Sequence, residues 1–125
     1  MADITKGQME AQISVAMINF EKEYMGRGPK EIKTYIIKDM IFIRLKGVLT
    51  PAEEQLAKTD EGANLIKKVR VQLLESAKAL LSIMVNEITG YNVISLHTDI
   101  STKTGERIIV FTLDKDLEDN FGISS

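Results

Sequence analysis

The sequence predicts an α+β fold, a two-layer sandwich in which a four-stranded antiparallel sheet of two β-hairpins carries helices on one face, in the order α-ββ-αα-ββ. Apolar residues recur three or four apart over Glu61–Ile88, which predicts a long helix. Two segments rich in β-branched and aromatic residues, Ile32–Lys46 and Tyr91–Leu113, are each interrupted once, which predicts two hairpins. With 125 residues, we expect a single domain over residues 1–125.

The first expected element is a helix over Gln8–Tyr24. Its apolar stripe consists of Met9, Ile13, Met17, Phe20 and Tyr24. Gly26 is placed to end this helix in the left-handed conformation. The segment Gly26–Lys30 that follows holds two glycines and two cations, so an anion-binding loop is one interpretation. It lacks the Lys-Ser/Thr pair that opens the helix of a phosphate loop, and the pattern favours a helix stop and a turn into a strand.

The first hairpin is expected over Ile32–Lys46, with its turn at Lys38–Asp39 and its end at Gly47. This turn lacks the glycine that two-residue hairpin turns prefer. Along the second strand, alternation assigns Ile41, Ile43 and Leu45 to the core face and Phe42, Arg44 and Lys46 to a mixed face.

Two helix starts follow the first hairpin. Thr50 is a predicted N-cap, Pro51 occupies the first turn, and Glu53 is placed to close a capping box, for a short helix that stops near Lys58. Thr59–Glu61 offers a new cap for the long helix, which Gly90 closes. The apolar row of the long helix consists of Leu65, Val69, Leu73, Ala77, Leu81, Met84 and Ile88. The predicted stripe is wide, because four further apolar residues lie within or beside this row: Ile66, Leu74, Leu80 and Val85.

The second hairpin is expected to pair Tyr91–Ser101 with Arg107–Leu113. Thr102–Gly105 suits a type I turn with Gly105 in the left-handed position. Beyond Asp114 the chain is acidic and polar, and we expect residues 115–125 to form a frayed tail.

Charge and composition exclude several classes of function. The net charge is −2 and the two signs are interleaved, so we expect no nucleic-acid partner. The absence of cysteine excludes disulfides, thiol catalysis and thiolate metal sites, and is compatible with the cytoplasm. Met1–Lys6 lacks the features of a signal peptide, and no apolar run approaches the roughly 18 residues of a membrane span.

The mixed face of the sheet is expected to be too apolar to remain exposed. Phe42 and Val93 are assigned to it, and both faces of Ile108–Phe111 are apolar. An uncovered apolar face usually has a partner. The sequence therefore predicts a homo-oligomer, most simply a two-fold homodimer.

One row of polar residues could be interpreted as a catalytic or metal-binding site. Ser95, His97, Asp99 and Ser101 alternate along one strand and share a face. Residues two apart on a strand rarely converge as a catalytic triad requires, and His97 with Asp99 supplies only two metal ligands. The pattern favours a row of satisfied polar side chains, and we predict no catalytic residue, no metal site and no cofactor.

Several longer strings carry a family resemblance. They are Gly26–Lys30, Ile36–Met40, Arg44–Glu53, His97–Arg107 and Ile109–Asp114. Over about Gln8–Glu118 the chain resembles the bacterial MpsC domain, named for a sodium-translocating, membrane-potential-generating system. The resemblance implies a small intracellular protein associated with a cation-translocating membrane assembly, and it implies no catalytic residues. A chain without a membrane span cannot conduct sodium, so the expected role is accessory or regulatory.

The first hypothesis is therefore a non-enzymatic, cytoplasmic docking protein, peripheral to the membrane through membrane subunits of such a system. It would dock by its open sheet face or by the junction between first helix and first strand. The alternative is a small-molecule or anion sensor with a groove formed by Arg27, Lys30, His97 and Arg107. An enzyme is the third hypothesis. The residues predicted to contact a ligand or partner are Arg27, Lys30, Arg44, His97, Asp99 and Arg107.

Overall fold

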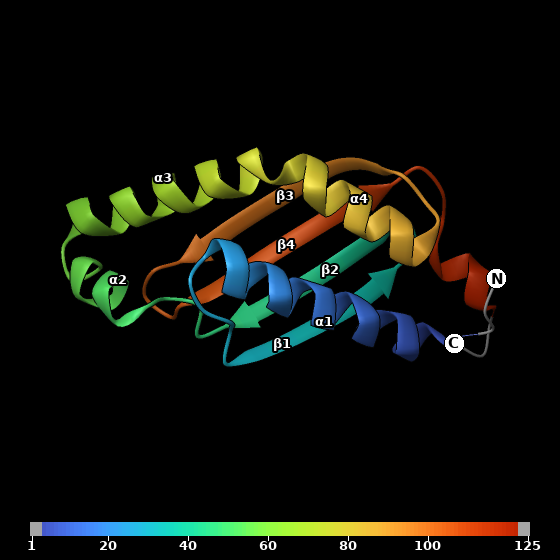
Figure 1. The fold of residues 1–125 in the computed structure, drawn as a ribbon, viewed down its shortest axis with the longest axis horizontal. Helices are drawn as coiled ribbons and strands as arrows, with labels where there is room; N and C mark the ends of the chain where they lie inside the picture. The colour runs from blue at the N-terminus through green and yellow to red at the C-terminus, as the bar shows by residue number, and fades with distance from the viewer. Residues whose placement is uncertain (1–3, 123–125) are drawn as a thin grey trace.

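The structure is a computed structural model that describes residues 4–122 of the chain. Within that range the elements follow the predicted order, with a short 3-10 helix added at the end (Figure 1). They are α1 (Lys6–Tyr24), β1 (Glu31–Ile37), β2 (Met40–Lys46), α2 (Pro51–Leu56), α3 (Asp60–Ser76), α4 (Lys78–Thr89), β3 (Val93–Ser101), β4 (Glu106–Leu113) and η1 (Glu118–Phe121).

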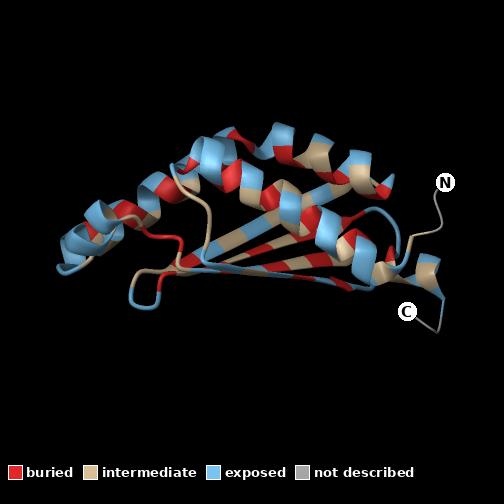
Figure 2. Cartoon of the chain, turned by 60° about the horizontal axis from the view of Figure 1, so that its bottom comes forward, coloured by how far each residue is buried: buried red, intermediate tan, exposed pale blue. Residues whose placement is uncertain are grey.

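The four strands form one antiparallel sheet in the order β1-β2-β4-β3. Each hairpin pairs its own two strands, and β2 and β4 join the hairpins at the centre, where Phe42 lies beside Val110. Helices α1, α3 and α4 lie on one side of the sheet, and the described residues place no helix against the other (Figure 2). The predicted fold class is confirmed.

The core lies between the sheet and the helices, because alternate strand residues point toward the helices. Ile41, Ile43 and Leu45 of β2 are fully buried, as the alternation predicted. They are joined by Ile109 and Phe111 of β4. From the helices, the core receives Ile13, Met17, Leu74, Leu81 and Val85.

Helix α1 begins at a capping box that the sequence analysis did not identify. The Thr5 hydroxyl accepts a hydrogen bond from the Gln8 backbone N–H at 3.1 Å, and the Gln8 side chain accepts one from the Thr5 N–H at 2.8 Å. Tyr24, assigned to the buried stripe, is 49% exposed. Gly26 follows with φ +90°, in the left-handed region as predicted.

The predicted long helix is two helices, α3 and α4, separated at Ala77. Ala77 has φ −97° and ψ 3°, and the Ser76 hydroxyl donates a hydrogen bond to the Leu73 carbonyl at 2.8 Å. A serine that bonds back to its own helix bends it. Gly90 closes α4 with φ +79°, as expected.

The buried stripe of α3 lies one residue away from the central row of the predicted stripe. Ile66, Arg70 and Leu74 are buried, whereas Leu65, Val69 and Leu73 are 40–51% exposed. The central row of the predicted stripe was wrong in α3, because Ile66 and Leu74, which were expected within or beside that row, form the buried line together with Arg70, which the stripe left out. Ala77, at the break between the two helices, and Leu81 of α4 are buried as predicted.

The turns match their predicted positions. The β1–β2 turn lies at Lys38–Asp39, and Lys38 adopts φ +56°, the conformation that a glycine would have adopted without strain. Thr50 and Glu53 form the predicted capping box, although α2 ends at Leu56. Gly105 closes the β3–β4 turn with φ +73°.

Two strand-end predictions need correction. A register shift between Val93 and Ser95 turns Val93 to the helix side, where it packs against the core, and leaves Ile94 64% exposed.

The segment after Asp114, expected to fray, folds back instead: Leu117 is fully buried and Glu118 pairs with Lys6 at 2.8 Å. Residues 123–125 of the expected tail lie outside the described residues.

Candidate functional site

The uncovered side of the sheet, which we call the open face, has an apolar centre. On β2 and β4, Phe42 and Val110 lie side by side at intermediate exposure, with Ile108 next along β4. On β1, Tyr35 and Ile37 are 46% and 43% exposed. The predicted apolar second face is therefore present, with Phe42 on it and Val93 absent from it.

The two halves of the open face differ in net charge. The half formed by β1 and β2 carries Glu31, Lys33, Arg44 and Lys46, whereas the half formed by β3 and β4 carries Asp99 and Glu106. Arg44 and Glu106 meet at the centre as an ion pair, with Nε and Oε2 2.5 Å apart. The face is thus positive toward β1 and negative toward β3.

The polar row on β3 forms a hydrogen-bonded group at the edge of the open face. The Ser95 hydroxyl lies 3.1 Å from Nε2 of His97 and also bonds to the Thr112 hydroxyl on β4. Ser95 and His97 thus do converge, contrary to the expectation for residues two apart on a strand.

Asp99 does not complete a triad with these two side chains. Its Oδ1 accepts a hydrogen bond from the Ile100 N–H at 2.8 Å and lies 3.9 Å from Nζ of Lys67 on α3. Across residues 4–122, no group of three or more histidine, cysteine, aspartate or glutamate side chains is arranged to hold a metal ion.

The structure does not bring the residues of the predicted groove together. Arg27 lies after α1, where its Nη1 donates to the Leu49 carbonyl at 3.2 Å. Lys30 precedes β1 at the end of the sheet, and His97 lies on the open face. Arg107 points the other way, into the core, and is 1% exposed.

Arg107 belongs to a buried charge network at the junction of α1, α2, α3 and β4. Its Nη1 lies 3.3 Å from Oε2 of Glu21, and its Nη2 donates to the Arg70 carbonyl at 3.1 Å. Arg70 in turn donates to Glu53 through Nε at 2.9 Å and Nη2 at 2.7 Å, and Nη2 also donates to the Val48 carbonyl. Two arginines and two glutamates thus join the helices to the sheet.

Burial shifts the pKa values of charged groups in this network. It raises the pKa of Glu21 despite the attraction of Arg107 and Arg70, and it lowers the pKa of Arg107. Burial alone would also raise the pKa of Glu53, but the hydrogen bonds from Arg70 and Thr50 outweigh it and lower this pKa. Within the described part of the chain, Oε1 of Glu21, Nη1 of Arg70 and Nε of Arg107 are buried without a hydrogen-bond partner.

Sequence reasoning missed Glu21, Arg70 and Glu53 as a group, although a signal was present. Glu21 continues the four-residue spacing of Met9, Ile13 and Met17, and Arg70 lies between Ile66 and Leu74 at the same spacing. Charges of opposite sign that fall in phase with two apolar stripes are typical of a buried ion pair.

With this geometry in place, comparison with known proteins identifies the family. The sequence profile described as "Na+-translocating membrane potential-generating system (MpsC)" matches residues 5–115. The chain belongs to the MpsC family. The match spans the sheet, the helices and the whole open face, as the resemblance in the sequence strings indicated.

Two relatives of this MpsC family chain come from Bacillus subtilis strain 168, and both are described as uncharacterized proteins. YbcI is 47% identical over 116 residues, which cover 93% of this chain and 94% of YbcI. YrhF is 26% identical over 99 residues, which cover 78% of this chain and 81% of YrhF. No solved structure matches the chain. In residues 4–122, no helix has the length and apolar character needed to cross a membrane.

Proposed function

We propose that this MpsC family chain is a non-enzymatic accessory or regulatory protein that acts by docking through its open face, and that the first occupant of that face is a second copy of the chain. The observation that carries the proposal is the apolar centre of the uncovered face, where Tyr35 is 46% exposed and Phe42 and Val110 are partly exposed. Apolar patches of this kind on a folded surface mark interaction sites.

Charge complementarity supports a second copy as the occupant. A two-fold axis that lies between two facing sheets, parallel to their strands, places β1 of one copy over β3 of the other. Each row of side chains that runs across the four strands then faces the same row of the other copy. Lys33, Arg44, Ile108 and Asp99 form one such row. Lys33 of each copy therefore approaches Asp99 of the other, and the positive half of each face covers the negative half of its partner.

The family description supports the setting of this role. A profile named for a sodium-translocating, membrane-potential-generating system relates the chain to a membrane assembly. The dimer would be cytoplasmic and reach the membrane through membrane subunits of that assembly. Sodium translocation itself is not assigned to this chain.

A charge swap tests the dimer. Lys33→Glu and Asp99→Lys each place like charges opposite one another, so each should weaken the dimer, whereas the double variant should restore it because opposite charges then face each other again. We expect each single change to raise the dimer dissociation constant by about tenfold at low salt. Sedimentation equilibrium at several concentrations provides the measurement.

Phe42→Asp tests the apolar centre. It should convert the dimer to a monomer of 14.0 kDa, because it places an unpaired charge at the middle of the interface. Tyr24→Asp is the matched control, since Tyr24 is a half-exposed aromatic residue on α1, away from the open face. A wild-type protein that is monomeric throughout, or a dimer unaffected by both the charge swap and Phe42→Asp, would overturn the proposal.

A further inference from the structure

A second surface lies on the helical side of the molecule, away from the open face. Helices α3 and α4 follow each other end to end as one bent rod (Figure 1). Backbone hydrogen bonds continue across the break, because the Ala77 N–H donates to the Leu73 carbonyl at 3.2 Å and the Leu81 N–H donates to the Ala77 carbonyl at 3.0 Å. Residues 60–89 thus form a rod about 45 Å long at 1.5 Å per residue.

One side of this rod carries apolar residues that are 40–57% exposed, which we call the outer row. Their spacing of three, four or seven residues places side chains along one side of a helix. Isolated apolar residues are ordinary on a protein surface, whereas a continuous row indicates an interaction surface. The outer row consists of Leu65, Val69, Leu73, Leu80 and Ile83.

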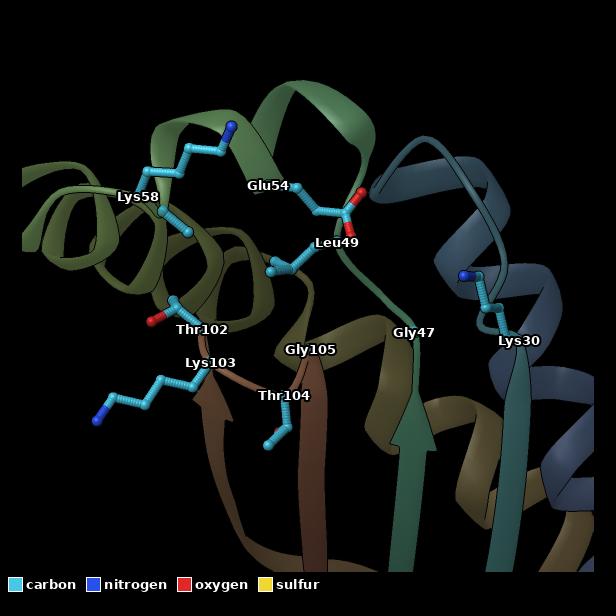
Figure 3. A pocket seen from close by; sticks show the side chains of 10 residues that line it. Lys30, Gly47, Leu49, Glu54, Lys58, Thr102, Lys103, Thr104 and Gly105 are labelled. Carbon is cyan, nitrogen blue, oxygen red and sulfur yellow. The ribbon is translucent and has the colours of Figure 1, made fainter.

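The sheet leaves the N-terminal end of the outer row uncovered. Figure 1 shows that α2 and the first turns of α3 extend beyond the end of the sheet. In Figure 3, a hollow of about 430 Å³ separates α2 from the β3–β4 turn, and the side chains of Lys58 and Lys103 on its two sides point away from each other. A long partner segment therefore has access to the rod from its first turn onward.

Three exposed charged residues run beside the outer row. Glu61, Lys68 and Glu75 are seven residues apart, so they share one side of α3. Glu61 lies four residues before Leu65 and Lys68 three residues after it, which makes both of them neighbours of the row. The ion pairs formed within residues 4–122 include none of these three charges. Charges at this position beside an apolar row select the partner helix in coiled coils.

The signs of these charges discriminate between possible occupants of the row. An anionic lipid surface attracts lysine and arginine beside an apolar row, but two of the three charges here are glutamates. In an antiparallel pair of α3 helices from two copies, the register that places Lys68 opposite Glu75 also places Glu61 opposite Ser82, without a cation. A separate helix with the charge order cation, anion, cation matches all three charges.

We infer that the outer row binds an amphipathic helix of a partner protein, whose apolar side covers Leu65, Val69 and Leu73. This helix carries a lysine or arginine opposite Glu61, an acidic residue opposite Lys68 and a further cation seven residues on. The inference rests on the proposed accessory role, because it supplies the contact by which the chain reaches its assembly. It does not depend on the open-face dimer, which uses the other side of the sheet.

Two synthetic helical peptides test this surface. Both carry the same leucines at three- and four-residue spacing, and they differ only in three charges that are seven residues apart. The first peptide has lysine, glutamate, lysine, and the second has glutamate, lysine, glutamate. Fluorescence anisotropy of each labelled peptide with the full chain should show about tenfold tighter binding of the first peptide. Phe42→Asp protein should bind it equally well, so the result can be interpreted whether or not the open-face dimer forms.

Variants of exposed residues assign the binding to the outer row. Val69→Asp should weaken binding of the first peptide by about tenfold or more, because it places a charge in the apolar contact. Val15→Asp is the matched control, since Val15 is 58% exposed on α1, outside the row. The triple variant Glu61→Lys, Lys68→Glu, Glu75→Lys should reverse the preference and favour the second peptide.

The inference is wrong if neither peptide binds, if both bind equally, or if the triple variant keeps the wild-type preference. Self-association of Phe42→Asp protein that Val69→Asp abolishes would replace the partner helix with a second copy. Binding to vesicles of equimolar phosphatidylcholine and phosphatidylglycerol that Val69→Asp abolishes would replace it with a lipid surface.

Discussion

At the scale of single residues, Arg107 and Arg44 lie on paired central strands but differ in surroundings. Arg107 is buried against Glu21, whereas Arg44 pairs with Glu106 on the open face with about half of its side chain exposed. Breaking a buried ion pair leaves an uncompensated charge in the core, but an exposed pair contributes little. Arg107 therefore has a structural role, although its residue type suggested a ligand contact.

Arg107→Ala should consequently lower the free energy of unfolding by about 3–5 kcal/mol. Arg44→Ala, the matched exposed arginine, should lower it by less than about 1 kcal/mol. Urea denaturation of both variants at one protein concentration provides the measurement. Equal losses in the two variants would show that the buried network does not join the helices to the sheet as described.

Glu53 gives the network a pH dependence with a definite sign. Its folded-state pKa is lowered below 4.5 by Arg70 and Thr50, so its contribution to stability is present above about pH 4.5 and is lost as the pH falls through the folded pKa. The stability difference between wild type and Glu53→Gln should therefore shrink as the pH falls below about 4.5 toward the lowered folded-state pKa. A constant difference for Glu53→Gln would argue against its bond to Arg70.

At the scale of elements, Gly62 fixes the packing of α2 against α3. A Cβ at Gly62 would lie 1.9 Å from the Leu56 carbonyl oxygen, which is backbone and cannot move aside. Gly62→Ala should therefore destabilise the protein by about 1–3 kcal/mol.

Gly7→Ala is the matched control for this change, since the nearest atom to a Cβ there is the Thr5 hydroxyl at 4.0 Å. It should be neutral or stabilise the protein by up to about 1 kcal/mol, as alanine usually does in a helix. Thermal unfolding compares the two variants. If Gly62→Ala were as stable as Gly7→Ala, the contact between α2 and α3 would differ from the one described.

The elements also show what the sequence can and cannot predict. Thr50 caps α2 through its own hydroxyl, and Gly47 and Gly105 adopt positive φ angles at their turns, so local rules placed the caps and turns. The phase of α3 depends on Arg70, whose burial is stabilised by Glu21 and Glu53 from distant parts of the chain. Arginine as a residue type is usually exposed, so the spacing that aligns Arg70 with Ile66 and Leu74 was overlooked, and the spacing alone does not identify its partners. The break between α3 and α4 at Ala77 also has only a weak sequence signal, because the residues around it are good helix formers.

In the candidate site too, features with a local sequence signal were predictable and features formed by distant residues were not. The open face was predictable because the run of apolar residues Ile108–Phe111 places apolar side chains on both faces of a strand, which is a local signal. The buried charge network was not, because Glu21, Arg70 and Arg107 are separated by long stretches of chain and meet only in the core. His97 and Arg107 were grouped by residue type, although they point to opposite faces of the sheet.

At the scale of the whole molecule, the proposed dimer packs two open faces against each other. The two hairpins joined through β2 and β4 produce a sheet covered on one side (Figure 2). The net charge of its open face changes from positive on the half formed by β1 and β2 to negative on the half formed by β3 and β4. This arrangement makes the face self-complementary about a two-fold axis parallel to the strands. In the proposed dimer, β1 of each copy would lie about 10 Å above β3 of the other.

Because the chain has no cysteine, cross-linking of two single-cysteine variants tests this arrangement most directly. Lys33→Cys and Asp99→Cys proteins are mixed, allowed to exchange subunits and treated with a bis-maleimide that spans the sheet-to-sheet distance of about 10 Å. Position 33 of one copy should face position 99 of the other, so the mixture should yield covalent dimer well above either variant alone. Equal yields in all three samples, or no covalent dimer in the mixture, would contradict the face-to-face dimer.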